Sequence, residues 1–219
     1  MSPPSGSLAH TLAGVAIFQI SEGEQGYSLA FKPGRLFNSP GSLNTIRGRD
    51  VTFQQQACQA LIQAIEDIDA QFLIHVPDST VAPVIAYFFN HSIIRTFAVA
   101  REEEAVGIAA GLQMAGKKAV ILIQDTGLGN SLTALTTFSA AYRVSTFLVV
   151  ARRGGLGEIN SAVHHFSDGV SDMLEALGFR PFALDRRTPL ELWASTVVGA
   201  YNHCLVAHRP VIVLVDLKE

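Results

Sequence analysis

Residues 119–130 read AVILIQDTGLGN, and this stretch carries the strongest indication of the fold. The segment from Ala119 to Gln124 is apolar up to its last residue and lacks the polar alternation of a half-exposed strand. Uninterrupted apolar strands are typical of parallel sheets that helices cover on both faces. A polar segment with two glycines follows, and we predict that it forms a loop leading into a helix over 130–143.

The same alternation of strands and helices extends in both directions from this stretch. We predict further strands over 72–76, 96–99, 146–151, 181–184 and 211–216, and further helices over 52–67, 81–91, 102–115, 167–177 and 189–208. Right-handed crossovers between parallel strands place helices on both faces and gather the loops after the strands at one edge. The predicted fold class is therefore α/β: a three-layer, doubly wound domain with a six-stranded, mainly parallel sheet.

The first 50 residues differ from the rest because Ser, Pro and Gly turns dominate them. Two short segments, 15–20 and 27–31, have the β-branched and aromatic content of strands, which predicts a hairpin. Partial disorder is the alternative. We therefore expect an N-terminal arm over 1–50 and one folded domain over 51–219.

The composition limits the class of function. Only 16% of the 219 residues are charged, whereas soluble proteins average about 25%, so we infer a surface that a partner buries. The net charge is −3 without a block of like charge, which argues against nucleic-acid binding. Apolar runs are far shorter than the roughly 20 residues of a membrane span, and we find no secretion signal. Cys58 and Cys204 are too few for a disulfide framework, so we expect a cytoplasmic setting.

Three successive carboxylates open the helix predicted over 102–115. The positive end of the helix dipole favours Glu102, Glu103 and Glu104 at this place. Neighbouring helical residues point about 100° apart. We therefore expect at most one of the three carboxylates to face the buried side, which we assign to Ile108 together with the leucine one turn later.

Other polar residues follow the predicted strands. Asp78 and Ser79 come after the first strand, where one of them can cap the next helix and the other can enter a site. The Gly-x-Gly segment after the third strand lacks the third glycine of a dinucleotide fingerprint. His164 and His165, which we place in a long loop after the fourth strand, are either a proton-shuttling pair or surface residues. No spacing of ligand residues indicates a metal site.

Taken in order, these segments resemble the pyrimidine-binding domain of thiamine-diphosphate enzymes. The resemblance spans about 51–218, and it is greatest to the small subunit of sulfopyruvate decarboxylases and the matching half of phosphonopyruvate decarboxylases. The pieces that carry it are Val76-Pro77-Asp78-Ser79, Glu102 with Glu104 to Gly111, Gln124 with Gly127-Leu128-Gly129-Asn130, and Arg153-Gly154. Each piece alone is a weak signal, but their order is specific.

The resemblance implies a role for Glu102. In this family a glutamate nine residues before the last glycine of the helix motif binds N1′ of the cofactor aminopyrimidine, and counting back from Gly111 gives Glu102. A carboxylate there favours the imino tautomer, which removes the proton from C2 of the thiazolium.

The resemblance assigns further residues to the same site. The residues that would bind the cofactor beside Glu102 are Gly127, Leu128, Gly129 and Asn130. Those that would bind the substrate are Asp78, Ser79, Gln124 and Asp125, and those that would serve in acid/base catalysis are His164 and His165. The substrate class that it implies is a small 2-keto acid.

The resemblance also implies a partner. Family members hold Mg²⁺ and the diphosphate with a Gly-Asp-Gly motif, which this sequence lacks, so a separate subunit would supply that half of the site in a hetero-oligomer. Gly107 and Gly111 would permit the close packing at which like domains pair. The expected function is a decarboxylase subunit. A carboligase subunit similar to acetolactate synthase and a non-catalytic assembly or regulatory subunit are the alternatives.

Overall fold

The computed structural model describes residues 16–23, 26–33 and 52–218. The chain divides into two units, Met1–Asp50 and Val51–Glu219, and each is described by itself. In the first unit, β1 (Ala16–Gly23) pairs antiparallel with β2 (Gly26–Pro33), and the two strands overlap the segments predicted to form a hairpin.

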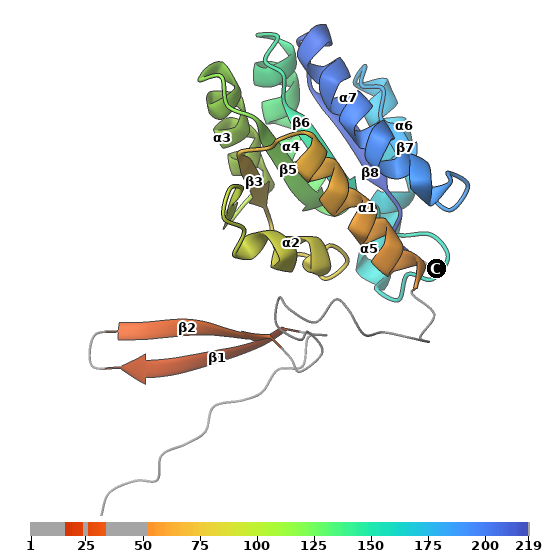
Figure 1. The fold of residues 1–219 in the computed structure, drawn as a ribbon. Helices are drawn as coiled ribbons and strands as arrows, with labels where there is room; N and C mark the ends of the chain where they lie inside the picture. Colours follow the sequence, from red (N-terminus) through yellow and green to blue (C-terminus); the bar gives the residue numbers. More distant parts are fainter. Residues whose placement is uncertain (1–15, 24–25, 34–51, 219) are drawn as a thin grey trace, which may run out of the picture. The chain divides into compact units, whose positions relative to one another are not determined.

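The second unit contains the predicted sheet (Figure 1). Its strands are β3 (Phe72–His75), β4 (Arg95–Ala98), β5 (Ala119–Gln124), β6 (Phe147–Ala151), β7 (Phe182–Leu184) and β8 (Val211–Val215). They form a 6-stranded sheet in the order β4-β3-β5-β6-β8-β7, and every neighbouring pair is parallel. Strands β6 and β8 are buried along their whole length and β5 is buried up to Gln124, as their apolar sequences predict.

Helices cover both faces of this sheet (Figure 1). One face carries α1 (Phe53–Asp67), α2 (Ala82–Phe89) and α7 (Trp193–Ala207), which follows the short 3-10 helix η2 (Leu190–Leu192). The other carries α3 (Glu102–Met114), α4 (Asp125–Ala134) with its π-helical continuation η1 (Leu135–Ala140), α5 (Ser161–Asp168) and α6 (Val170–Ala176). The predicted three-layer α/β class is confirmed.

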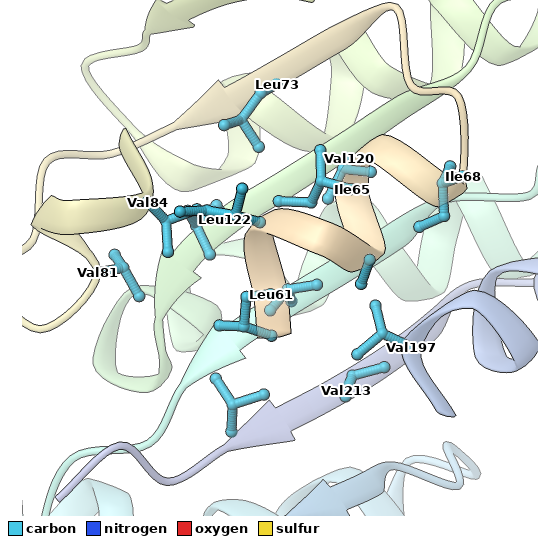
Figure 2. Close-up of a cluster of buried hydrophobic side chains, with 14 of the residues drawn as sticks. Leu61, Ile65, Ile68, Leu73, Val81, Val84, Val120, Leu122, Val197 and Val213 are labelled. Atoms are coloured by element: carbon cyan, nitrogen blue, oxygen red, sulfur yellow. The ribbon is translucent and has the colours of Figure 1, made fainter. Parts of the chain in front are cut away.

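The first of the two cores lies between α1 and the sheet. Figure 2 shows Leu61 and Ile65 of α1 over Val120 and Leu122 of β5. These side chains are almost completely shielded from solvent, and Val213 of β8 extends the same layer. Alternate residues of β5 point to the opposite core, so this one strand joins the two helical layers.

Two predicted boundaries were wrong. The helix predicted from residue 130 begins at Asp125, so the Gly-x-Gly segment is helical and not a loop. The long loop predicted before residue 167 contains α5, and α6 follows it after Gly169. Asn160 caps α5 by accepting a hydrogen bond from the backbone N–H of Ala162 at 3.1 Å. In both places the glycines suggested turns.

Within the residues that the structure describes, no helix has the combined length and apolar character needed to cross a bilayer.

We predict that Leu122→Ala lowers the free energy of unfolding by about 2–5 kcal/mol, because it opens a cavity in a fully buried layer. Val206→Ala is the matched control, since Val206 on α7 is largely exposed and its truncation should cost less than about 0.5 kcal/mol. Urea unfolding followed by circular dichroism measures both. Equal losses in the two variants would contradict the core described here.

Candidate active site

Glu102 lies at the first residue of α3, directly after β4 and its connecting loop. Its side chain is turned inward, and the residue is only 8% exposed. Glu103 instead pairs with Arg101 at 2.8 Å, and Glu104 accepts hydrogen bonds from the backbone N–H groups of Ala100 and Arg101. The expectation that only one of the three carboxylates faces inward is therefore confirmed.

The buried side of α3 is only partly the one that we assigned, because Leu112 packs against the core but Ile108 does not. Ile108 is 40% exposed, and the face toward the sheet is made by Ala105, Val106, Ala109 and Ala110. Small side chains on this face let α3 lie close to its neighbours. The outer face contains Ile108 and Gly111, and among the described residues a Cβ at Gly111 would meet no atom within 4 Å.

The Glu102 carboxylate is held against the first turn of α4. Its Oε2 accepts a hydrogen bond from Nδ2 of Asn130 at 3.0 Å. A Cβ built on Gly127 would lie 2.1 Å from Oε1 of Glu102, closer than any real contact. The carboxylate therefore occupies the space that any other residue at 127 would need. Among the described residues Oε1 has no hydrogen-bond partner, so one oxygen of a nearly buried carboxylate is left for a ligand.

Gly127 and Gly129 allow other side chains to pack closely against the helix backbone, and they do not reverse the direction of the chain. Gln124 is extended and precedes the helix, which then runs through Gly127 and Gly129. A Cβ on Gly129 would lie 2.9 Å from the ring of Phe166 on α5. Since glycine inside a helix costs up to about 1 kcal/mol relative to alanine, its presence here is explained by Glu102 and Phe166 packing against the bare backbone.

Arg153 forms the centre of a second cluster at the same edge of the sheet. It follows β6, and its guanidinium donates from Nη1 to Oδ2 of Asp78 and to Oε1 of Gln124, both at 3.1 Å. Nε and Nη2 donate to the two carboxylate oxygens of Glu158 at 2.8 and 3.2 Å. The side chains of Arg153, Asp78 and Glu158 are only 13%, 6% and 4% exposed. Polar ends of β3, β5 and β6 are thus joined through one cation.

Asp125 links the cluster around Arg153 to the start of α4, where Gly127 and Gly129 lie. Its carboxylate is fully buried and accepts hydrogen bonds from the backbone N–H of Arg153 at 2.9 Å and from the hydroxyl of Ser167 at 3.0 Å. Burial raises the pKa of Asp125 above its usual range, and these hydrogen bonds oppose that shift. The residue therefore ties the start of α4 to β6 and α5.

Neither Asp78 nor Ser79, which follow β3, caps the next helix, α2. Asp78 accepts a hydrogen bond from the backbone N–H of Thr80 at 2.9 Å and so closes a turn before α2. The residue at the start of that helix is Val81, and no side chain caps it. Ser79 is exposed, and no side-chain hydrogen bond is formed by it within the described part of the chain.

Both histidines lie on α5. Nε2 of His164, which is partly buried, lies 3.3 Å from the backbone carbonyl oxygen of Glu158. His165 is exposed on the neighbouring side of the helix. In residues 52–218 and the described hairpin, no group of three or more His, Cys, Asp or Glu side chains could hold a metal ion.

Six of the residues singled out from the sequence therefore fall into two clusters, whereas Leu128 is fully buried in the core and Ser79, Gly129, His164 and His165 belong to neither cluster. Glu102, Gly127 and Asn130 meet directly, whereas Asp78, Gln124 and Asp125 converge on Arg153. The Arg153 side chain and Glu158 were not among the site residues expected from the sequence. The sequence does show opposite charges at these two positions on either side of a glycine-rich segment. That spacing alone does not predict that the loop between them folds back and brings the two side chains together.

Comparison with known proteins gives a consistent result. The family described as "Thiamine pyrophosphate enzyme, N-terminal TPP binding domain" matches residues 55–177. The chain is 34% identical over 161 residues to sulfopyruvate decarboxylase subunit alpha of Methanothermobacter thermautotrophicus, covering 73% of this chain and 95% of that subunit. Its identity to the subunit of the same name from Methanococcus maripaludis is 29% over 160 residues, covering 73% and 94%.

A solved structure shares the fold. Benzoylformate decarboxylase from Polynucleobacter necessarius superposes with a TM-score of 0.56 at 16% identity, over 74% of this chain and 30% of that enzyme. The sheet and its helical layers are therefore an arrangement that also forms one part of a larger enzyme.

We predict that Gly127→Ala lowers the free energy of unfolding by about 1–3 kcal/mol, because the new methyl group displaces the Glu102 carboxylate. Gly199→Ala is the control: Gly199 lies in α7 with open space around it, and the substitution should raise that free energy by up to about 1 kcal/mol. Urea unfolding of the two variants tests the close approach, which would be refuted if Gly127→Ala were as stable as Gly199→Ala.

The ion pair of Glu158 predicts a pH dependence of stability. The hydrogen bond from Arg153 lowers the pKa of Glu158 to about 2 from the usual 4.5. A depressed carboxyl pKa contributes stability that is complete above the unfolded-state value and is lost as the pH falls toward the folded-state value. The excess stability of the wild type over Glu158→Gln should therefore shrink as the pH falls from about 5 to about 2. Thermal unfolding across this range measures it, and a constant difference would contradict the pairing.

Proposed function

The chain belongs to the thiamine pyrophosphate enzymes that share the N-terminal TPP binding domain, and on that basis we propose that it is the small subunit of a heteromeric, thiamine-diphosphate-dependent 2-keto acid decarboxylase. The observation that carries this proposal is the nearly buried Glu102 carboxylate, which is anchored through one oxygen and whose other oxygen has no hydrogen-bond partner among the described residues. The names of the related alpha subunits support sulfopyruvate as the substrate.

The residues around Glu102 fit the aminopyrimidine of thiamine diphosphate. Asn130 holds Oε2 and so fixes the rotation of the carboxylate, which leaves Oε1 as the atom that would share a proton with N1′. Gly127 keeps the adjoining backbone bare, and the exclusion of water strengthens a hydrogen bond to a charged group. When bound, the cofactor would supply the electron sink that lets a 2-keto acid lose carbon dioxide.

The second cluster would shape the substrate side of the site. We propose that three residues act on the substrate side of the site: Asp78, Gln124 and Asp125. Because each of them is hydrogen-bonded to Arg153, their role would be indirect. Ser79, which is exposed at the same edge, remains available for direct contact. One of the two adjacent histidines, His164 or His165, is the proposed acid/base group for the proton that the product requires.

A partner subunit completes the proposed enzyme. The sequence has no Gly-Asp-Gly motif, so we assign Mg²⁺ and diphosphate binding mainly to a second chain. The outer face of α3, where Gly107 and Gly111 have no neighbour within 4 Å of an added Cβ among the described residues and Ile108 is exposed, supports pairing of like domains there. The relatives are themselves named as subunits, which supports a hetero-oligomer.

We also keep the domain division and the location as parts of the proposal. Residues 51–219 would be the pyrimidine-binding domain, and 1–50 an arm whose role is open to test. Cys58 and Cys204 are free thiols, which supports a reducing, cytoplasmic setting. Burial raises their pKa to about 11 and about 12, which makes both thiols unreactive.

We expect Glu102→Gln to lower kcat/KM for sulfopyruvate by about 10²–10⁴-fold, since an amide cannot share a proton with N1′ in the same way. The assay uses the chain combined with the Gly-Asp-Gly subunit from the same source, thiamine diphosphate and Mg²⁺, with phosphonopyruvate and pyruvate as comparison substrates. Glu103→Gln is the control, because Glu103 pairs with Arg101 on the surface, and it should stay within about twofold.

The products of the same assay separate the alternatives. Free aldehyde and carbon dioxide support the decarboxylase, and an acyloin would support a carboligase instead. Full activity of the Glu102→Gln complex would mean that the subunit is non-catalytic and would overturn the proposal.

A further inference from the structure

Arg153 sits in a network of hydrogen bonds whose purpose the proposed function leaves unexplained. One guanidinium is shielded from water together with two carboxylates, from Asp78 and Glu158. Burying three charges costs free energy that their mutual attraction only partly returns. The two parallel hydrogen bonds to Glu158 have the geometry in which arginine, unlike lysine, fixes both position and orientation.

The pair with Glu158 determines the course of the loop between β6 and α5. Gly154, Gly155 and Gly157 have positive φ values of 67°, 70° and 86°, so the chain turns back on itself within a few residues. The carboxylate of Glu158 also accepts a hydrogen bond from the backbone N–H of Asn160 at 2.9 Å. Because Asn160 then caps α5, the ion pair sets where that helix begins.

The same loop contacts only one of the two histidines. Nε2 of His164 lies 3.3 Å from the carbonyl oxygen of Glu158. A carbonyl can only accept, so this contact requires the proton on Nε2 and leaves the lone pair on Nδ1. His165 is the next residue of the helix, about 100° further round, and it is exposed.

We propose that Arg153 is a positioning residue for His164. By fixing Glu158, Arg153 directs the backbone carbonyl of that residue toward Nε2 of His164 and leaves Nδ1 free to take up or return a proton. His164 is then the acid/base group, and His165 is not. This assignment of roles rests on the proposed decarboxylase function. The hydrogen-bonded arrangement itself does not, and it can be tested in the chain alone.

The first experiment is ¹⁵N NMR of the histidine rings in the full chain at a pH where they are neutral. We expect His164 to show a single Nε2–H tautomer with a slowly exchanging proton, and His165 to show the averaged signal of a solvated ring. Arg153→Lys keeps the charge but loses the paired hydrogen bonds, and it should make the His164 signal resemble that of His165. Glu158→Gln serves as a second variant in case the first does not fold.

A matched control is Arg187→Lys, because Arg187 forms the same kind of paired hydrogen bond with Asp185 but is exposed. It should leave both histidine signals unchanged. An averaged His164 signal in the wild type, or an unchanged one in a folded Arg153→Lys variant, would overturn the arrangement.

The second experiment measures kcat and KM of the complex for Arg153→Lys, His164→Gln and the double variant. If Arg153 acts through His164, the double variant should be no slower than His164→Gln, whose kcat should fall by about 10²-fold or more. His165→Gln should keep kcat within about threefold, and its effect should multiply with that of Arg153→Lys.

The outcomes distinguish the two proposals. Multiplying losses for Arg153 and His164, or a larger loss for His165→Gln, would overturn the positioning role while leaving the decarboxylase intact. Absence of decarboxylation in the wild-type complex would instead overturn the proposed function, and the NMR result would still decide the hydrogen-bonded arrangement.

Discussion

The candidate site depends on the missing side chain at position 127. Helices α3 and α4 start at the same edge of the sheet, and Glu102 can turn inward only because Gly127 leaves its backbone bare. A carboxylate in such a place would ordinarily be fully hydrogen-bonded. Here Asn130 satisfies one oxygen, and the second is left for whatever molecule enters the site.

A second constraint is electrostatic. Arg153 neutralises two carboxylates that the fold removes from water, and Asp125 connects the same segment to α4 and α5. A buried network of this kind contributes little net stability but fixes geometry where every member is satisfied. The helical segment with Gly127 and Gly129 and the cluster around Arg153 are therefore both held by the start of α4. A substitution in either one is expected to perturb the other.

The sheet and the starts of α1, α2 and α3 could be predicted from the sequence, whereas the starts of α4 and α5 could not, for physical reasons. The strands that are apolar throughout, such as Val211–Val215, have few other places in a fold than the centre of a parallel sheet. Glycines ordinarily indicate turns, so the start of α4 and the whole of α5 were missed where tertiary contacts made glycine necessary. Glu102 was found through its motif, whereas the pairing of Arg153 with Glu158 depends on how the loop folds back and has no signal in spacing alone.

A crystal structure of the complex formed with the Gly-Asp-Gly subunit and thiamine diphosphate would show whether Glu102 receives the cofactor. We expect Oε1 of Glu102 within hydrogen-bond distance of N1′, with Asn130 still on Oε2 and the second chain enclosing the pocket. A cofactor bound elsewhere, or a Glu102 side chain turned into solvent, would contradict this expectation.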